Sequence, residues 1–309
     1  AGNSSTTVGS GITVDTQIAP STIVALSPSS DSGITGDNKT NDTTPTFSGV
    51  AEPGATVKVV VGGQTLTTTA AADGTWSVTP TALAAGTYTP AVTVTDAAGN
   101  SSSTTGSAVT IDTSVTTTAA LDSSSDSGTT GDNKTNDTTP AISGTTEAGA
   151  AVKVVVGGQT LTTTAGSDGK WSVTVPTALA DNTYTPVVTV TDVSGNTATI
   201  NGTAFTIDSS ISPATTVALA ASSDSGTSGD NKTNDTTPTI AGTAEPGATV
   251  KVVVGGQTLT VTAAADGTWS VTPTALTDGT YTPVVTVTDA AGNSSTTVGS
   301  GIKIGRAHV

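Results

Sequence analysis

Residues 54–70 are GATVKVVVGGQTLTTTA, and the stretch returns as GAAVKVVVGGQTLTTTA at 149–165 and as GATVKVVVGGQTLTVTA at 247–263. Val57, Val59 and Val61 occupy alternate positions, with Lys58 between the first two. This period of two is typical of a strand with one buried and one solvated face. The Gly-Gly pair that follows favours a tight turn into a second strand. The stretch therefore predicts a β-hairpin that occurs three times.

The hairpin belongs to a longer repeat. Trp76, Trp171 and Trp269 lie 95 and then 98 residues apart, and residues 1–12 (AGNSSTTVGSGI) are identical to residues 291–302. Such a period predicts tandem modules instead of one large core. We expect residues 1–15 to be the C-terminal strand of a preceding repeat. Residues 16–112, 113–208 and 209–302 form the three predicted repeats.

The last seven residues break the pattern. Ile12 is followed by Thr-Val-Asp, whereas Ile302 is followed by KIGRAHV. This ending resembles a translated sequencing adapter, so residues 303–309 are expected to be an artefact, with a short divergent C-terminus as the alternative. In the first case the only arginine, Arg306, and the only histidine, His308, have no function.

Composition excludes several classes of protein. Nine Lys and Arg stand against 24 Asp and Glu, which gives a net charge of −15. Because nucleic-acid binding requires basic residues to neutralise phosphates, nucleic acid is an unsuitable partner and cations are more suitable. The absence of cysteine excludes disulfides, thiolate metal sites and a cysteine nucleophile. No apolar run of membrane-spanning length is present in the sequence.

Thr, Val, Gly and Pro dominate each repeat, and no segment shows a sustained helical period. In the first repeat, seven strands are predicted near residues 23–26, 45–50, 56–61, 65–70, 75–79, 87–95 and 108–111. We expect Leu26, Phe47 and Trp76 in the core, together with Tyr88, Pro90, Val92 and Val94. This profile predicts an all-β fold of tandem immunoglobulin-like, seven-stranded β-sandwich modules in an extended string, without the cysteine pair of antibody domains.

Four segments of the first repeat carry a more specific resemblance. These are DSGITGDNKTNDTTP (31–45), AEPGATVKV (51–59), ADGTWSV (72–78) and VTVTDAAGN (92–100). In this order they resemble the bacterial Ig-like repeats of giant secreted adhesins of the biofilm-associated-protein class, over residues 1–302. The resemblance implies an extracellular, calcium-responsive stalk that holds an adhesive tip away from the cell.

The carboxylates are expected to gather where modules meet. If the seven strands run up and down, the loop carrying Asp31, Asp37 and Asp42 shares an end with Asp112, and Glu52, Asp73 and Asp96 lie at the other end. The first junction would then combine Asp31, Asp37, Asp42 and Asp112 with Glu147, Asp168 and Asp192. Clustered like charges repel, and such a set favours Ca²⁺, which accepts six to eight hard oxygen ligands.

The predicted metal ligands are Asp31, Asp37, Asp42, Asp96 and Asp112 and their equivalents Asp126, Asp132, Asp137, Asp192, Asp208, Asp224, Asp230, Asp235 and Asp289. Asp73 is assigned to a hairpin turn instead. The alternative for the whole set is ordinary turn chemistry, in which Asp side chains bond the local backbone. The linkers add one further hypothesis. Asp112 to Leu121 is two residues shorter than Asp15 to Leu26 or Asp208 to Leu219, so the first junction could bend.

These observations predict a non-catalytic protein, because no constellation of nucleophile and base is present. The leading hypothesis is a calcium-stiffened stalk segment of a secreted or cell-surface bacterial adhesin, acting in adhesion and biofilm formation. Its partners are the neighbouring repeats of the same chain. Two alternatives stay open: a module that binds surface polysaccharide through exposed tryptophans or threonine faces, and a self-associating extracellular filament or surface-layer subunit.

Overall fold

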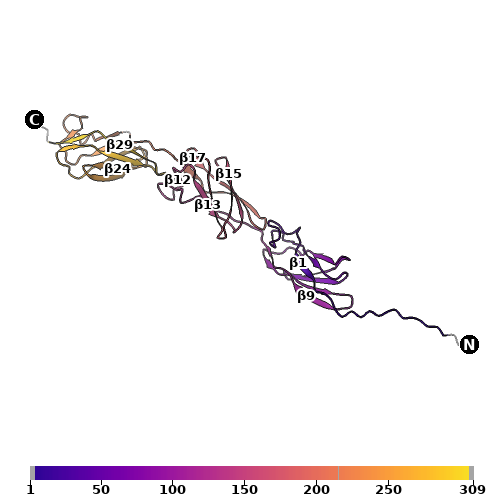
Figure 1. The fold of residues 1–309 in the computed structure, drawn as a ribbon. Helices are drawn as coiled ribbons and strands as arrows, with labels where there is room; N and C mark the ends of the chain where they lie inside the picture. The colour runs from indigo at the N-terminus through magenta and orange to yellow at the C-terminus, as the bar shows by residue number, and fades with distance from the viewer. Residues whose placement is uncertain (1–3, 215, 306–309) are drawn as a thin grey trace.

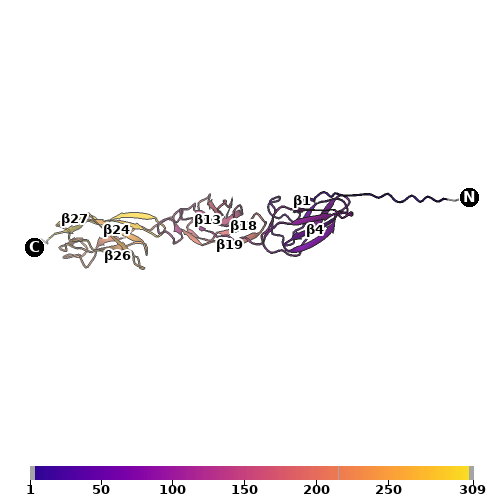
Figure 2. The same cartoon turned by 90° about the horizontal axis from the view of Figure 1, so that it is seen from below.

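The computed structural model describes residues 4–214 and 216–305. It contains three β-sandwich modules joined end to end, with the two ends of the chain at opposite ends of the string (Figures 1 and 2). All regular elements within the described ranges are strands. The all-β class and the three repeated immunoglobulin-like modules predicted from the sequence are confirmed.

Each module uses ten strands in the same order, so that the number of a strand rises by ten from one module to the next. In module 1 the strands are β1 (Thr22–Leu26), β2 (Lys39–Thr40), β3 (Phe47–Val50), β4 (Thr56–Val61), β5 (Gln64–Thr69), β6 (Thr75–Val78), β7 (Gly86–Tyr88), β8 (Ala91–Thr95), β9 (Ser101–Thr105) and β10 (Val109–Ile111).

Modules 2 and 3 repeat this order with small changes of length. Module 2 contains β11 (Ala120–Leu121), β12 (Lys134–Thr135), β13 (Ala141–Thr145), β14 (Ala151–Val156), β15 (Gln159–Thr164), β16 (Lys170–Thr174), β17 (Asn182–Tyr184), β18 (Val187–Thr191), β19 (Thr197–Asn201) and β20 (Phe205–Ile207). Module 3 contains β21 (Thr216–Leu219), β22 (Lys232–Thr233), β23 (Ile240–Thr243), β24 (Thr249–Val254), β25 (Gln257–Thr262), β26 (Thr268–Val271), β27 (Gly279–Tyr281), β28 (Val284–Thr288), β29 (Ser294–Val298) and β30 (Ile302–Ile304).

Three sheets enclose the core of each module. In module 1 their strand orders are β1-β3-β6, β5-β4-β8-β9 and β2-β10-β7. Neighbouring strands are antiparallel except β2 and β10, which are parallel. All three sheets contribute side chains to one buried cluster. It includes Phe47, Trp76, Val59, Val92 and Ile111. The predicted alternation of the valines in β4 is confirmed, since Val57, Val59 and Val61 are buried and Lys58 is exposed.

Three details of the predicted strands were wrong. The two-residue strand β2 within the acidic segment was not expected. The single strand expected over residues 87–95 is two strands, β7 and β8, which lie in different sheets. They separate at Pro90, whose missing N–H group favours a break in a ladder. The polar strand β9, with the sequence SSSTT, was not expected because it has no apolar alternation. It lies at the edge of its sheet, where such a sequence is tolerated.

The turn that joins β4 to β5 explains the invariant Gly-Gly step of the repeat. Gly62 and Gly63 both have positive φ, at 55° and 75°. Two such residues form the hairpin turn whose twist matches the flanking strands, and L side chains rarely adopt it. Gln64 then closes the neighbouring loop, because its Oε1 accepts a hydrogen bond of 2.8 Å from the Thr81 amide. The same contact recurs at Gln257 and Thr274.

Residues 4–20 precede the first module as an extended segment outside any strand. Val8, Ile12 and Val14 are 91%, 91% and 80% exposed. The segment projects beyond β1 at the indigo end of the string (Figure 1). It begins to contact module 1 at Asp15, whose carbonyl oxygen accepts a hydrogen bond of 3.2 Å from Asn100 Nδ2, and at Ile18, which packs against the module 1 core.

Candidate functional site at the module junctions

The acidic loop of each module is built from carboxylates that bond their own backbone. In module 1, Asp31 accepts a hydrogen bond from the Gly36 amide, Asp37 accepts one from Lys39 N at 2.9 Å, and Asp42 accepts one from Thr44 N at 2.8 Å. Asn38 between them has a left-handed φ of 58°, which Asn tolerates better than most residues. These contacts are the ordinary turn chemistry of aspartate.

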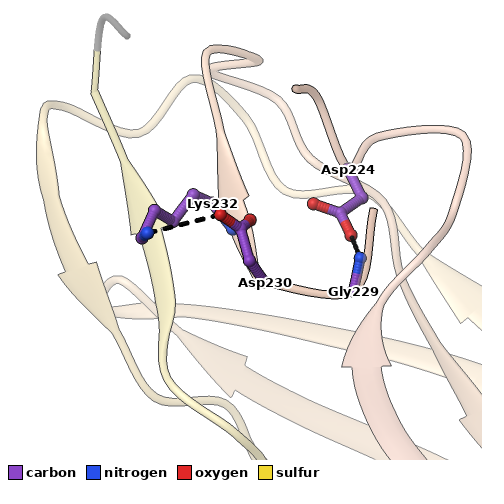
Figure 3. A network of polar contacts seen from close by, with 4 residues as sticks. All are labelled: Asp224, Gly229, Asp230 and Lys232. Carbon is purple, nitrogen blue, oxygen red and sulfur yellow. Dashed lines mark hydrogen bonds and ion pairs between the residues drawn. The ribbon is translucent and has the colours of Figure 1, made fainter. Parts of the chain in front are cut away.

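Figure 3 shows this loop in module 3. One carboxylate oxygen of Asp224 accepts a hydrogen bond from the Gly229 amide, and Asp230 forms an ion pair of 3.3 Å with Lys232. The other oxygen of Asp224 is buried and has no hydrogen-bond partner among the residues that the structure describes. The same is true of Oδ1 of Asp31 and of Asp126 within the described ranges. Among the described residues, each acidic loop therefore has one buried carboxylate oxygen without a hydrogen-bond partner.

The opposite end of each module carries a second turn that recurs in every repeat, from Asp96 to Asn100 in module 1. Asp96 accepts hydrogen bonds from Asn100 N at 2.8 Å and from Asn100 Nδ2 at 2.7 Å. The hydrogen bond from the Asn100 side chain is the main cause that lowers the pKa of Asp96 below its ordinary value. We call this turn the DxxGN turn, and its copies span residues 192–196 and 289–293.

At each junction the DxxGN turn of one module contacts the acidic loop of the module before it. At junction 1–2, Ser32 Oγ donates to Ser194 O at 2.5 Å, and Ile34 N donates to Val193 O at 2.9 Å. Asn196 Nδ2 donates to Asp112 O at 3.0 Å, which ties the turn to the linker.

Junction 2–3 repeats these contacts. Ser127 Oγ donates to Ala291 O at 2.5 Å, and Thr129 N donates to Ala290 O at 2.8 Å. Asn293 Nδ2 donates to Asp208 O at 2.8 Å. The expectation that a two-residue difference in linker length changes the junction is therefore not met, because the contacting atoms are the same.

A glycine in the acidic loop makes the contact possible. Gly33 and Gly128 have φ of +70° and +68°, and a Cβ at either would lie 2.1 Å from Val193 O or 2.2 Å from Ala290 O. Neither backbone atom can move away cheaply. At the free end of module 3, the equivalent Gly226 has φ of +86° and nothing within 4 Å of its Cβ position. The glycine is thus required by the turn in every module and by the neighbouring module at the two junctions.

Three carboxylates meet beside these contacts. At junction 1–2, one oxygen each from Asp112, Glu147 and Asp192 lie within 4.8 Å of one another, and Asp208, Glu245 and Asp289 form the same group at junction 2–3. The Asp112 amide bonds to Thr40 O at 2.9 Å, which fixes the first carboxylate next to the acidic loop. Burial, followed by the negative charges of Asp112 and Asp192, raises the pKa of Glu147, and Lys39 opposes this.

The structure thus gathers some of the predicted ligands and separates others. Asp112, Asp192, Asp208 and Asp289 lie in the two clusters. Asp96 occupies the equivalent turn at the outer end of module 1. The acidic-loop residues lie outside both clusters. They are Asp31, Asp37 and Asp42 and their equivalents Asp126, Asp132, Asp137, Asp224, Asp230 and Asp235. All nine accept a hydrogen bond from a backbone amide within their own loops.

Two further differences concern the residues that the second module of each junction was expected to contribute. Asp168, expected at junction 1–2, lies in the β15–β16 turn, where it accepts a hydrogen bond of 3.1 Å from Lys170 N and pairs with the Lys170 ammonium. Glu147 and Glu245 were missing from the predicted ligand set, although each belongs to a cluster. Glu147 had been placed at junction 1–2 without being chosen as a ligand. The signal that could have added both residues is the glutamate that precedes β4, β14 and β24 in every repeat.

The tryptophans do not form an exposed platform. Trp76, Trp171 and Trp269 are each 4% exposed and belong to the three cores. Trp76 donates from its indole nitrogen to Ser21 Oγ at 3.0 Å. The indole nitrogens of Trp171 and Trp269 find no hydrogen-bond partner within residues 4–214 and 216–305. Burial of the rings removes the basis for stacking on sugars.

Comparison with known proteins identifies the repeat. A family model described as a bacterial Ig-like domain matches residues 17–113, 114–209 and 210–304. No curated protein matches the chain. In the part of the chain that the structure describes, no helix has the length and apolar character needed to cross a membrane.

Several solved structures resemble the chain. One, of a 1.5-MDa bacterial ice-binding adhesin, is 25% identical, with a TM-score of 0.42, over 93% of this chain and 96% of that one. A Ca²⁺-stabilised, ice-binding adhesin of an Antarctic bacterium is 30% identical, with a TM-score of 0.35, over 94% and 75%. A tetra-tandem repeat from the extending region of a large adhesion protein is 27% identical, with a TM-score of 0.32, over 89% and 73%.

Proposed function

Because this chain belongs to the bacterial Ig-like domain family, we propose that it is a non-catalytic stalk segment of a bacterial surface or secreted adhesin. The proposal includes a role in adhesion and biofilm formation outside the cell. Calcium ions bound between modules would stiffen the segment. The supporting features are the end-to-end arrangement of three near-identical modules and the acidic clusters between them.

The observation that carries the calcium proposal is the carboxylate cluster that recurs at both junctions. Asp112 lies at the end of one module, and Glu147 and Asp192 lie at the facing end of the next. Three carboxylates so close together repel one another. Burial raises the pKa of Glu147, and the negative charges of Asp112 and Asp192 raise it further. A bound divalent cation would remove this cost only when the two modules are aligned.

The chemistry of the cluster suits calcium. All three side chains offer hard oxygen ligands, and the described residues of the clusters include no nitrogen or sulfur donor. Calcium accepts carboxylates with one or two oxygens each and completes its shell with water or backbone carbonyls. Asp112, Glu147 and Asp192 would hold the ion at junction 1–2, and Asp208, Glu245 and Asp289 would hold it at junction 2–3.

Stiffening follows from binding to one arrangement of the modules. A ligand with higher affinity for the aligned junction shifts the population of conformers toward alignment. The contacts between the acidic loop and the DxxGN turn already define that arrangement. Calcium would therefore strengthen an alignment that the backbone specifies, and the excess negative charge would keep neighbouring stalks apart.

The experiment is calcium titration of the whole chain, followed by thermal unfolding and small-angle X-ray scattering in EDTA and in calcium. We expect calcium to raise the melting temperature and to narrow the distribution of particle lengths. Glu147→Gln should weaken the calcium response at junction 1–2 only, and Glu245→Gln at junction 2–3 only. Asp73→Asn, which changes a carboxylate in a hairpin turn, is the matched control. An equal response of all variants would contradict the proposed sites.

A further inference from the structure

The short strand β2 carries a lysine beside the carboxylate cluster of junction 1–2. Lys39 lies opposite Thr110 of β10, and Asp112 follows two residues after Thr110. The neighbours Thr40 and Ile111 are 0% and 1% exposed, so their side chains point into the core. Because side chains alternate along a strand, Lys39, Thr110 and Asp112 share the outer face of the pair. The ammonium of Lys39 is therefore on the same side as the carboxylate of Asp112.

The backbone of Lys39 is held in place on both sides. Its amide donates to Asp37 Oδ1 at 2.9 Å. The carbonyl oxygens of Asn38 and Thr40, before and after it, accept hydrogen bonds of 2.9 Å from β10 and from the Asp112 amide. The position of the lysine next to the junction is thus fixed by the backbone, and its long side chain alone is left to move.

The charge of Lys39 reaches the cluster across the junction. Burial, and then the charges of Asp112 and Asp192, raise the pKa of Glu147, and the positive charge of Lys39 opposes them. Lys39 belongs to module 1 and Glu147 to module 2, so this attraction acts between modules. Within the described ranges, the ammonium of Lys39 forms no ion pair of its own. An unpaired cation beside three carboxylates is attracted to all of them.

The same arrangement recurs at junction 2–3, and module 3 shows a second place for this lysine. Lys134 of β12 lies opposite Thr206 of β20, two residues before Asp208. In module 3 the equivalent Lys232 pairs with Asp230 of its own acidic loop at 3.3 Å (Figure 3). A lysine at this position is therefore able to pair with its own loop as an alternative to the cluster.

On the basis of the calcium sites proposed above, we propose that Lys39 and Lys134 act as tethered counter-ions, which partly neutralise the clusters without calcium and are displaced when calcium binds. The lysine reduces the repulsion in the cluster, so the modules stay aligned without the ion. It also opposes a second cation, so it sets the calcium concentration at which the junction stiffens. On calcium binding, the ammonium moves to the aspartate of its own loop, as Lys232 does.

Calcium affinity tests the competition. Glu245→Gln removes the proposed site at junction 2–3, so isothermal titration calorimetry of the whole chain in this background reports on junction 1–2. Adding Lys39→Gln should raise the calcium affinity about three- to tenfold, because the ion no longer meets a positive charge. Lys58→Gln is the matched control, since Lys58 is exposed in the middle of β4, opposite Thr67 and Thr93. It removes the same charge and should leave the affinity nearly unchanged.

Alignment in EDTA tests the counter-ion role without calcium. Spin labels are attached to cysteines that replace Thr65 and Thr160, which are exposed in β5 and β15. The distribution of distances between the labels should be broader in Lys39→Gln than in the wild type, because three carboxylates without a counter-ion repel one another. Lys39→Arg keeps the charge and should retain the narrow distribution. Calcium should narrow the distribution of Lys39→Gln again.

Failure of the calcium sites and failure of the lysine role give different results. A wild type that binds no calcium contradicts the sites, and with them the competition by lysine. A wild type that binds calcium with the same affinity as Lys39→Gln overturns the role of the lysine alone, and so does an equal rise in affinity in Lys58→Gln. Identical distance distributions of the wild type and Lys39→Gln in EDTA also overturn it.

Discussion

Junctions 1–2 and 2–3 make the same contacts although their linkers differ by two residues. In both, the DxxGN turn meets the glycine of the acidic loop, and an Asn side chain bonds the carbonyl of the linker aspartate. Val115 and Ile211, three residues after that aspartate, both pack against the core of the following module. The extra residues of the second linker, Ser212 and Pro213, come only after this point. Length differences are therefore absorbed inside the module, and the junction is unchanged.

The modules do differ at one position inside the core, next to the indole nitrogen of the tryptophan. Five residues before the aligned leucine of the first strand, module 1 has Ser21, module 2 has Thr116 and module 3 has Ala214. Only Ser21, among these residues, bonds the tryptophan indole nitrogen in the described structure. The repeats therefore keep the contacts between modules more strictly than the polar contacts inside each core.

The largest effect is expected from breaking one junction and sparing an equivalent glycine that has no neighbour. Gly128→Ala places a Cβ against Ala290 O and should separate modules 2 and 3. Gly226→Ala has the same unfavourable positive φ, at a cost of about 1 kcal/mol, but meets nothing. The distribution of distances between spin labels on modules 2 and 3 should broaden strongly in Gly128→Ala and not in Gly226→Ala. Equal distributions in both would show that the glycine serves the turn alone.

The next effect concerns the charge of the first junction. Because the pKa of Glu147 is raised above 4.5 in the folded chain, the folded state holds its proton more tightly than the unfolded state. The resulting stability is present below the unfolded pKa and is lost as pH rises through the folded pKa. In EDTA, the melting temperature of the wild type minus that of the Glu147→Gln variant should therefore fall as the pH rises. Calcium should abolish this dependence, and a flat difference in EDTA would refute it.

A smaller effect is expected in the core of module 3. Ala214→Ser restores the hydroxyl that Trp76 uses in module 1, and it should give Trp269 a partner for its indole nitrogen. One such hydrogen bond stabilises by about 1 kcal/mol, so calorimetry should show a higher transition for module 3. Ser21→Ala should lower the transition of module 1 by a similar amount. If Ala214→Ser lowers the stability of module 3, the added hydroxyl does not fit.

The smallest effect is expected at Ser194, which sits in the DxxGN turn of junction 1–2. Its carbonyl accepts the hydrogen bond from Ser32, but its own hydroxyl is buried and unpaired within the described ranges. Module 3 has Ala291 at this position. Ser194→Ala should therefore be neutral or slightly stabilising, since it removes an unsatisfied polar group. A clear loss of stability in thermal unfolding would indicate that the hydroxyl has a partner in solution.

The sequence predicts the module well where apolar residues alternate. Val57, Val59 and Val61 specify a strand with one buried face, and the Gly62-Gly63 step specifies its turn, so both were found. Strand β9 was missed because its serines and threonines lie on a sheet edge and leave no pattern. The break between β7 and β8 depends on which sheet each half joins. That choice is made by tertiary contacts, and Pro90 is its only local sign.

The candidate site was predicted only in part for a related reason. The topological argument placed Asp112 and Asp192 at one junction, and the structure brings them together. It also placed the acidic-loop carboxylates there, but one oxygen of each accepts a hydrogen bond from a backbone amide of its own loop instead. The same argument placed Glu147 at this junction but did not select it as a ligand. Whether Glu147 or an acidic-loop aspartate reaches the carboxylates of the neighbouring module depends on backbone geometry. That geometry cannot be read from a single sequence.

The parallel pairing of β10 with β2 has a mechanical consequence. The chain enters module 1 beside the DxxGN turn and leaves through β10 at the other end of the module, where Asp112 contacts module 2. Tension applied to the ends would therefore slide β10 along β2 and β7, and their hydrogen bonds would have to rupture together. Yielding under load is governed by the unfolding barrier instead of by equilibrium stability. Single-molecule stretching should show modules that yield one at a time, each at a high force, so that the string extends stepwise before it fails.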